Sequence, residues 1–120
     1  MDSSTLISLA GIFAVAFLSL YSQVFFSRRK RRLAQKMAAG PKVIDVRTAR
    51  EYRKDRYPGA VNIPVQKLYM EPTKAGPKET PIVLYCQNGN RARRARRILK
   101  AYGYKNVTNA GGLGKLKALG

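Results

Sequence analysis

Histidine and cysteine are nearly absent from this sequence, which has 120 residues, no histidine and a single cysteine, Cys86. Without histidine, neither a Ser-His nor a Cys-His nucleophilic pair can form. One cysteine cannot make an internal disulfide bond, and it cannot supply a Cys₄ or Cys₂His₂ zinc site. Any chemistry at Cys86 must therefore be activated by groups other than imidazole, and we expect no metal and no cofactor.

Acidic residues are also scarce, with 6 Asp and Glu against 24 Lys and Arg, for a formal net charge of +18. Such a charge favours contact with polyanions of every class, including anionic lipid, small anions, acidic proteins and nucleic acid. We rank nucleic acid last among these partners, because the chain has no known nucleic-acid-binding motif.

A long apolar run lies near the N-terminus. The segment 5–26 has no charged residue, and a helix of that length rises about 33 Å, enough for a hydrocarbon core of about 30 Å. The charge order, with Asp2 before the run and a basic cluster after it, is the reverse of that in a secretory signal peptide. By the positive-inside rule, the cluster stays in the cytoplasm and contacts anionic lipid. The cluster comprises Arg28, Arg29, Lys30, Arg31 and Arg32.

These features predict a single-pass membrane protein whose C-terminal domain faces the cytoplasm. A buried core helix is the alternative, but the remaining chain is too short to surround a helix of this length. We expect three parts: a transmembrane anchor at 1–27, a basic juxtamembrane helix or linker at 28–40, and a folded domain at 41–120. The juxtamembrane stretch is rich in helix formers and ends at Gly40 and Pro41, so it should continue the anchor helix and stop there.

The last part alternates strand and helix signals. Short apolar runs at 42–46, 59–64, 81–86 and 105–110 predict strands. Helical signals follow at 48–55, where Thr48 and Glu51 form a capping box, and at 65–72, 90–102 and 111–120. This alternation predicts an α/β fold, with a small parallel β-sheet and helices on both of its faces.

The helix expected at 90–102 has an apolar face and a basic face. The apolar residues fall at helical spacing and are Ala92, Ala95, Leu99 and Tyr102. The other face carries Arg93, Arg94, Arg96, Arg97 and Lys100. These cations could attract an anionic small molecule, face the membrane or dock an acidic protein.

Cys86 ends the clearest predicted strand, and Arg91 lies in the first turn of the clearest predicted helix. Ligands of parallel sheets gather at this place, beyond the carboxyl ends of the strands. Glycine and asparagine tolerate positive φ, so the backbone N–H groups of the short connection can converge into a nest. Together with the helix N-terminus, a nest stabilises a thiolate or a bound anion. The connection is Gln87, Asn88, Gly89 and Asn90. The alternative is that Cys86 is a small buried apolar residue.

Several segments between 42 and 112 together resemble the single-domain rhodaneses, which are thiosulfate-type sulfurtransferases. They occur in the family's order: DVR at 45–47, EY at 51–52, PGAVNIP at 58–64, YCQNGNRA at 85–92 and GYKNVTNAGG at 103–112. The resemblance implies that Cys86 takes a sulfane sulfur from thiosulfate or a related anionic donor. The sulfur is then carried as a persulfide and passed to a thiol or to cyanide.

The same resemblance implies roles for the neighbouring residues. Gln87 to Arg91 would form the backbone cradle, and Arg91 would hold the anionic donor or brace the loop. Asp45 and Arg47 would help to fix the loop, although an ordinary structural ion pair is an equal alternative. The double glycine at 111–112 would serve a turn rather than bind a ligand.

The loop length and several departures from the family pattern bear on the function. Phosphatases of related architecture use a C-x₅-R loop, whereas Cys86 and Arg91 give C-x₄-R, a smaller nest that suits one persulfide sulfur. The family's first strand and much of its first helix are not found before residue 42. Arg56 stands where the family often has histidine, and no tryptophan follows the double glycine. The alternatives to a thiosulfate sulfurtransferase are a non-catalytic binding or tethering module and a protein-to-protein persulfide relay.

Overall fold

The computed structural model describes residues 2–119, and the chain divides into two units between Gln35 and Lys36. The first element, α1 (Ser3–Ala38), is one uninterrupted helix. It ends shortly before Gly40, which has a φ of +73°, a conformation that favours glycine and stops a helix. The prediction that the basic stretch continues the apolar helix and stops at Gly40 and Pro41 is confirmed.

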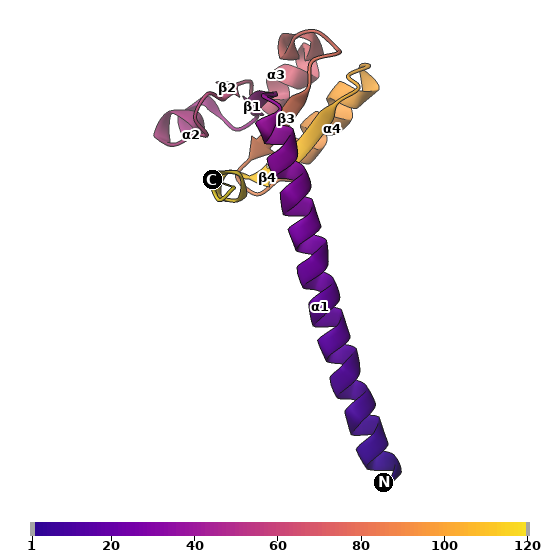
Figure 1. Ribbon diagram of the computed structural model, residues 1–120. Coiled ribbons are helices and arrows are strands. Elements are labelled where there is room, and N and C mark those ends of the chain that lie inside the picture. Colours follow the sequence, from indigo (N-terminus) through magenta and orange to yellow (C-terminus); the bar gives the residue numbers. More distant parts are fainter. Residues whose placement is uncertain (1, 120) are drawn as a thin grey trace. The chain divides into compact units, whose positions relative to one another are not determined.

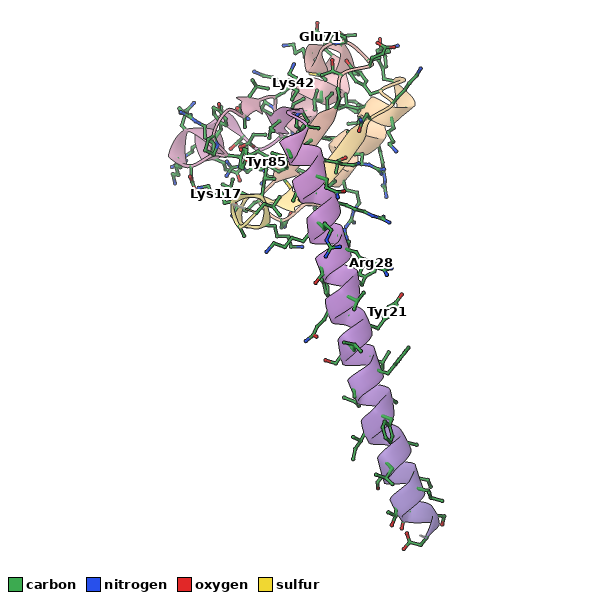
Figure 2. The ribbon with its side chains drawn as sticks, viewed as in Figure 1. Tyr21, Arg28, Lys42, Glu71, Tyr85 and Lys117 are labelled. Atoms are coloured by element: carbon green, nitrogen blue, oxygen red, sulfur yellow. The ribbon has the colours of Figure 1, made fainter. Side chains whose placement is uncertain are left out.

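The apolar part of α1 has the length and composition of a membrane-spanning helix. Its most apolar 18-residue window has a mean hydropathy of 2.0, and none of that window is buried in the structure. Side chains project outward from the helix, as Tyr21 and Arg28 do in Figure 2. Signal sequences and the core helices of soluble proteins can match the same length and composition. Insertion into a membrane therefore stays a prediction.

Four parallel strands form the sheet of the second unit in the order β2-β1-β3-β4. In the register of the strands, Asp45 lies beside Tyr85, and Cys86 lies beside Gly112. The carboxyl ends of parallel strands meet at one edge, so the sheet brings Asp45 and Cys86 to the same edge. The strands are β1 (Lys42–Asp45), β2 (Val61–Asn62), β3 (Ile82–Cys86) and β4 (Val107–Gly112).

Short helices connect these strands, and the contacts of α4 with β3 and β4 can be followed in Figure 1. α3 packs on α4, and α5 contacts β4 and β3. The helices are α2 (Ala49–Lys54), α3 (Val65–Met70), the 3₁₀ helix η1 (Pro72–Ala75), α4 (Asn90–Ala101) and α5 (Leu113–Lys117). The prediction of an α/β fold with a small parallel sheet flanked by helices is confirmed.

The main core lies where the sheet meets α3 and α4. It includes Ile44 and Leu84 from the two central strands, and Ala92, Ala95 and Leu99 from α4. All residues of β3 are buried, as expected for a central parallel strand covered on both faces. Three of the four residues predicted for the apolar face of this helix are therefore core residues.

The fourth, Tyr102, is 47% exposed, so its predicted place on the buried apolar face of the helix was wrong. The helix ends at Ala101, and Gly103 turns the chain with a φ of +103°. Because the chain turns here, Tyr104 enters the core instead, with 2% of its surface exposed. The Tyr104 hydroxyl donates a hydrogen bond to the carbonyl oxygen of Gly76.

The strands also differ in length or position from the predicted segments. β2 has only two residues, because Gly59 has a positive φ of +82° before it and Pro64 lacks an N–H group after it. β4 has the six residues predicted but is shifted by two residues toward the C-terminus, so that it runs through the double glycine to Gly112. No strand precedes β1 among the described residues, since residues 3–38 are helical.

Candidate active site

Cys86 lies at the carboxyl end of β3 and is fully buried, with 0% of its surface exposed. The backbone N–H of Gly89 donates a hydrogen bond to Cys86 Sγ over 2.9 Å. An N–H donor at this position stabilises negative charge on the sulfur. Cys86 is therefore buried, as the apolar alternative requires, but its sulfur also has a polar partner that an inert apolar cysteine does not need.

The loop after Cys86 turns sharply at Gly89, which has a φ of +93°. The two asparagines beside it do not adopt positive φ but hold the turn with their side chains. Asn88 Oδ1 accepts a hydrogen bond from the Asn90 backbone N–H over 3.1 Å. From β4, Asn109 Nδ2 donates to the Gly89 carbonyl oxygen over 3.1 Å. These bonds fix the Gly89 N–H toward the sulfur.

The double glycine packs against this loop from β4. A Cβ atom on Gly112 would lie 2.4 Å from the Gln87 carbonyl oxygen, which is closer than any side chain permits. A Cβ atom on Gly89 would lie 3.2 Å from Gly111 Cα. The interpretation of these glycines as a turn was wrong, because they are the last two residues of β4 and allow its backbone to approach the loop.

Arg91 points toward α2 and forms a bidentate ion pair with Glu51. Its Nη1 and Nη2 atoms donate to Glu51 Oε1 and Oε2 over 2.6 and 2.9 Å. The hydrogen bonds from Arg91 are the largest cause that lowers the pKa of Glu51, to about 2. The same contact raises the pKa of Arg91. The Arg91 guanidinium thus joins the first turn of α4 to α2, and bracing of the loop, one of the two roles predicted for it, stays a prediction.

Glu51 also belongs to the capping box of α2. Its backbone N–H donates to Thr48 Oγ1 over 3.2 Å, and its Oε1 atom accepts from the Thr48 N–H over 3.2 Å. The Glu51 carboxylate thus caps the N-terminus of α2 and also binds Arg91 in the first turn of α4. The sequence predicted the capping box but not the contact with Arg91, because nothing in the local pattern joins residues forty positions apart.

Asp45 and Arg47 form a buried ion pair at the end of β1. Their side chains are 0% and 3% exposed, and Arg47 Nη2 lies 2.7 Å from Asp45 Oδ2. The hydrogen bond to Asp45 raises the pKa of Arg47. Arg47 Nη1 also donates to Gln87 Oε1 over 3.3 Å. The two alternatives for this pair therefore hold together: it is a structural ion pair, and it also contacts the loop after Cys86.

Two further residues that the sequence did not single out support this edge of the sheet. Asn62 Nδ2 donates to the carbonyl oxygens of Asp45 and Arg47 over 3.0 and 2.9 Å. The Tyr85 hydroxyl accepts a hydrogen bond from the Tyr57 backbone N–H over 3.0 Å. Figure 2 labels Tyr85 within the folded part of the second unit. Asn62 lies inside PGAVNIP and Tyr85 directly precedes Cys86. These positions were the only signals in the sequence that could have pointed to the two residues.

The site is centred on a single thiol. Across residues 2–119, the structure brings together no group of three His, Cys, Asp or Glu side chains that could hold a metal ion. What it brings together is one sulfur, one N–H donor and a loop held by Arg91, Arg47 and Asn109. This arrangement can stabilise a thiolate and present it for attack on an electrophilic sulfur.

The family of the rhodanese-like domain matches residues 30–118. The chain belongs to this family. The thiosulfate sulfurtransferase PspE of Escherichia coli is 38% identical to it over 71 residues, which is 58% of this chain and 68% of that protein. Among solved structures, an E. coli rhodanese with anions has a TM-score of 0.59 and 34% identity, covering 63% of this chain and 91% of the other.

A human single-domain sulfurtransferase is also similar, with a TM-score of 0.63 and 28% identity over 73% of this chain and 91% of the other. These relatives support sulfur transfer as the general activity of this rhodanese-like domain.

Proposed function

We propose that this protein is a membrane-anchored sulfurtransferase that carries a sulfane sulfur on Cys86. The observation that carries the proposal is the Gly89 N–H, which lies 2.9 Å from Cys86 Sγ at the carboxyl edge of the sheet. The N–H stabilises the thiolate before attack. The fixed loop keeps this N–H directed at the sulfur, so the loop does not need to rearrange during the reaction. Thiosulfate or a related anion is the proposed donor.

The proposed reaction has two displacements at sulfur. The Cys86 thiolate attacks the outer sulfur of thiosulfate, the sulfur–sulfur bond of the donor breaks, and sulfite leaves with the electron pair. An acceptor thiolate or cyanide then attacks the outer sulfur of the Cys86 persulfide. The bond within the persulfide breaks, and Cys86 leaves again as the thiolate. No external oxidant or reductant is needed.

The neighbouring residues have supporting roles in this proposal. The backbone of Gln87 to Arg91 surrounds the transferred sulfur. Its Gly89 N–H already donates a hydrogen bond to Cys86 Sγ. Arg91 positions the loop through its ion pair with Glu51. It is also the cation closest in sequence to Cys86 after the loop, and we propose that it attracts the anionic donor. Asp45 and Arg47 support the loop through Gln87.

Intact mass of the full chain in a nonionic detergent, before and after excess thiosulfate, tests the proposal. We expect a gain of one sulfur atom that cyanide removes and that Cys86→Ser does not show. A wild-type protein that is folded by circular dichroism and gains no sulfur from thiosulfate would contradict the proposed donor. Cys86→Ser that still turns over would contradict the proposed nucleophile.

The anchoring part of the proposal places residues 1–27 across the membrane and residues 28–40 at its cytoplasmic surface. Residues 41–120 then form the domain that carries the site. The length and hydropathy of α1 and the basic cluster directly after the apolar run support this arrangement. Residues 1 and 120, where the first and last of these parts begin and end, lie outside the described residues.

A further inference from the structure

The solvent side of α4 carries three arginines that the proposed sulfur chemistry does not use. Arg93, Arg94 and Arg97 are all exposed, and we call them the arginine face. The other two arginines of the helix are engaged elsewhere. Arg91 pairs with Glu51, and Arg96 Nε donates to the Val107 carbonyl oxygen over 3.0 Å. The arginine face therefore has no structural role that accounts for it.

The protein's own carboxylates do not neutralise this face. Within residues 2–119 the ion pairs use the carboxylates of Asp45, Glu51, Glu71 and Asp55, and none of them involves the three arginines. Arg97 lies at i+3 and i+4 from Arg94 and Arg93, so these uncompensated cations repel one another and an anion bound there would relieve the repulsion. A partner that binds this face would therefore carry negative charge.

The arginine face begins at the loop that holds the candidate nucleophile. Asn90 is both the last residue of the loop and the first of α4, and it is exposed. Asn90, Arg94 and Arg97 follow each other at i, i+4 and i+7, so they share one side of the helix. Arg93 and Arg94 lie only about 6 Å along the axis from Asn90. A partner bound here is within reach of the loop.

The chemistry of the face favours an acidic protein over the other polyanions. Guanidinium groups bind carboxylates in a bidentate geometry, and arginine is enriched at protein interfaces. Single-stranded nucleic acid usually also requires aromatic platforms, and α4 has no aromatic residue. An interfacial membrane helix buries its apolar face in lipid, whereas the apolar residues Ala92, Ala95 and Leu99 of α4 are in the core.

We propose that Arg93, Arg94 and Arg97 dock an acidic protein that presents a thiol acceptor to the loop after Cys86. This inference rests on the proposed sulfur transfer and names its acceptor class. The acceptor thiolate attacks the outer sulfur of the Cys86 persulfide, the persulfide bond breaks, and Cys86 leaves as the thiolate. Cys86 itself is fully buried, and the acceptor needs to reach only the outer sulfur, because that is the atom transferred.

Two peptides of equal length test the proposal, one rich in Asp and Glu and the other with Asn and Gln in their place, each with one cysteine. The full chain in nonionic detergent is loaded with thiosulfate and desalted, and sulfur transfer to each peptide is followed by mass. We expect the wild type to prefer the acidic peptide by about tenfold at low salt, with the preference falling as salt rises. R93Q/R94Q/R97Q should lose most of this preference.

A matched control removes three charges elsewhere. K74Q/K78Q/K105Q changes η1 and the segments before β3 and β4, at the amino ends of these strands and away from the loop at the carboxyl end of β3, and should keep the wild-type preference. Equal loss in both triple variants would overturn the proposal, because net charge alone would then explain the result. A preference retained in R93Q/R94Q/R97Q would overturn it as well. Binding to phosphatidylglycerol vesicles or to an RNA oligonucleotide that the wild type shows and this variant loses would then identify the partner of the face.

The failure of the docking surface can be told apart from failure of the proposed function. If Cys86 takes up no sulfur, the proposed function fails, and docking is measured instead by fluorescence anisotropy of the acidic peptide with serine in place of its cysteine. Weaker binding to R93Q/R94Q/R97Q than to the control variant supports the surface. Equal binding to both variants overturns it.

Discussion

Gly112 shows how one missing side chain shapes the candidate site. It lies opposite Cys86 in the sheet, and a Cβ atom there would meet the Gln87 carbonyl oxygen at 2.4 Å. The neighbouring atom belongs to the backbone and cannot rotate away. The loop must therefore move if this residue changes, and the Gly89 N–H moves with it.

We predict that Gly112→Ala lowers the free energy of unfolding by about 1–3 kcal/mol, as overpacking does. The same substitution should also reduce the rate of persulfide formation at temperatures where the variant is still folded. Gly114→Ala is the matched control, because no atom lies within 4 Å of its added Cβ. Thermal melts and mass after thiosulfate measure both effects. A Gly112→Ala protein with wild-type loading would show that the close approach is not needed for the chemistry.

Arg91 gives a second prediction at this scale. Its ion pair with Glu51 is 26% and 32% exposed, and pairs of this kind contribute little to stability, about 1 kcal/mol or less. We expect Arg91→Ala to reduce kcat/KM for thiosulfate by tenfold or more while its melting temperature falls by only a few degrees. Steady-state rates and thermal melts on the same preparation decide this. Collapse of the fold would assign Arg91 a purely structural role.

Single residues were predicted unequally well from the sequence. Cys86, Asp45 and Arg47 could be placed because each stands at the end of an apolar run, and parallel strands end together. Glu51 could be recognised only as a cap, since its partner lies on another helix. Gly112 was misread because a double glycine before a helix is typical of a turn, and its contact with Gln87 depends on strand register.

At the scale of elements, one ion pair joins α2 to the first turn of α4. Glu51 lies in the first turn of α2 and Arg91 in the first turn of α4, so the position of the loop after Cys86 is tied to α2. A change in the charge of Glu51 should therefore be felt at both helices. The pKa of Glu51 is lowered from 4.5 to about 2, first by the hydrogen bonds from Arg91.

This shift predicts a pH dependence of stability. Because the folded pKa lies below the unfolded one, the contribution of Glu51 is complete above about pH 5 and disappears as the pH falls toward 2. Allowing for solvent screening of a partly exposed pair, we expect about 1 kcal/mol. Glu51→Gln should show this loss at neutral pH and converge with the wild type near pH 2. Urea unfolding at several pH values measures it, and parallel curves for the two proteins would contradict the assignment.

Most elements could be predicted because each has a strong local signal. The apolar run of β3, the periodicity of α4 and the capping box of α2 are each complete within a few residues. The two-residue length of β2 was not predicted, since it follows from Gly59 and Pro64 on either side. The strand order β2-β1-β3-β4 depends on contacts between distant segments, so no local pattern contains it.

At the scale of the whole molecule, the positive charge and the apolar helix belong to one arrangement in our proposal. The basic cluster Arg28 to Arg32 directly follows the apolar run, and a positive segment at this place resists transfer across a bilayer. The arginine face of α4 lies in the other unit and is proposed to bind protein. The net charge of +18 would thus be divided between two separate anionic partners.

The anchor makes the last prediction. We expect the wild type to stay in the membrane fraction after carbonate extraction, with its intact mass including residues 1–27. Phe13→Arg combined with Phe17→Arg should release it, because each arginine near the middle of a span costs about 2.5–3.5 kcal/mol. Phe13→Leu with Phe17→Leu is the control and should remain bound.

Protease added outside sealed cells should leave residues 41–120 uncut if they face the cytoplasm. A mature protein that lacks the apolar run would instead identify it as a cleaved signal sequence.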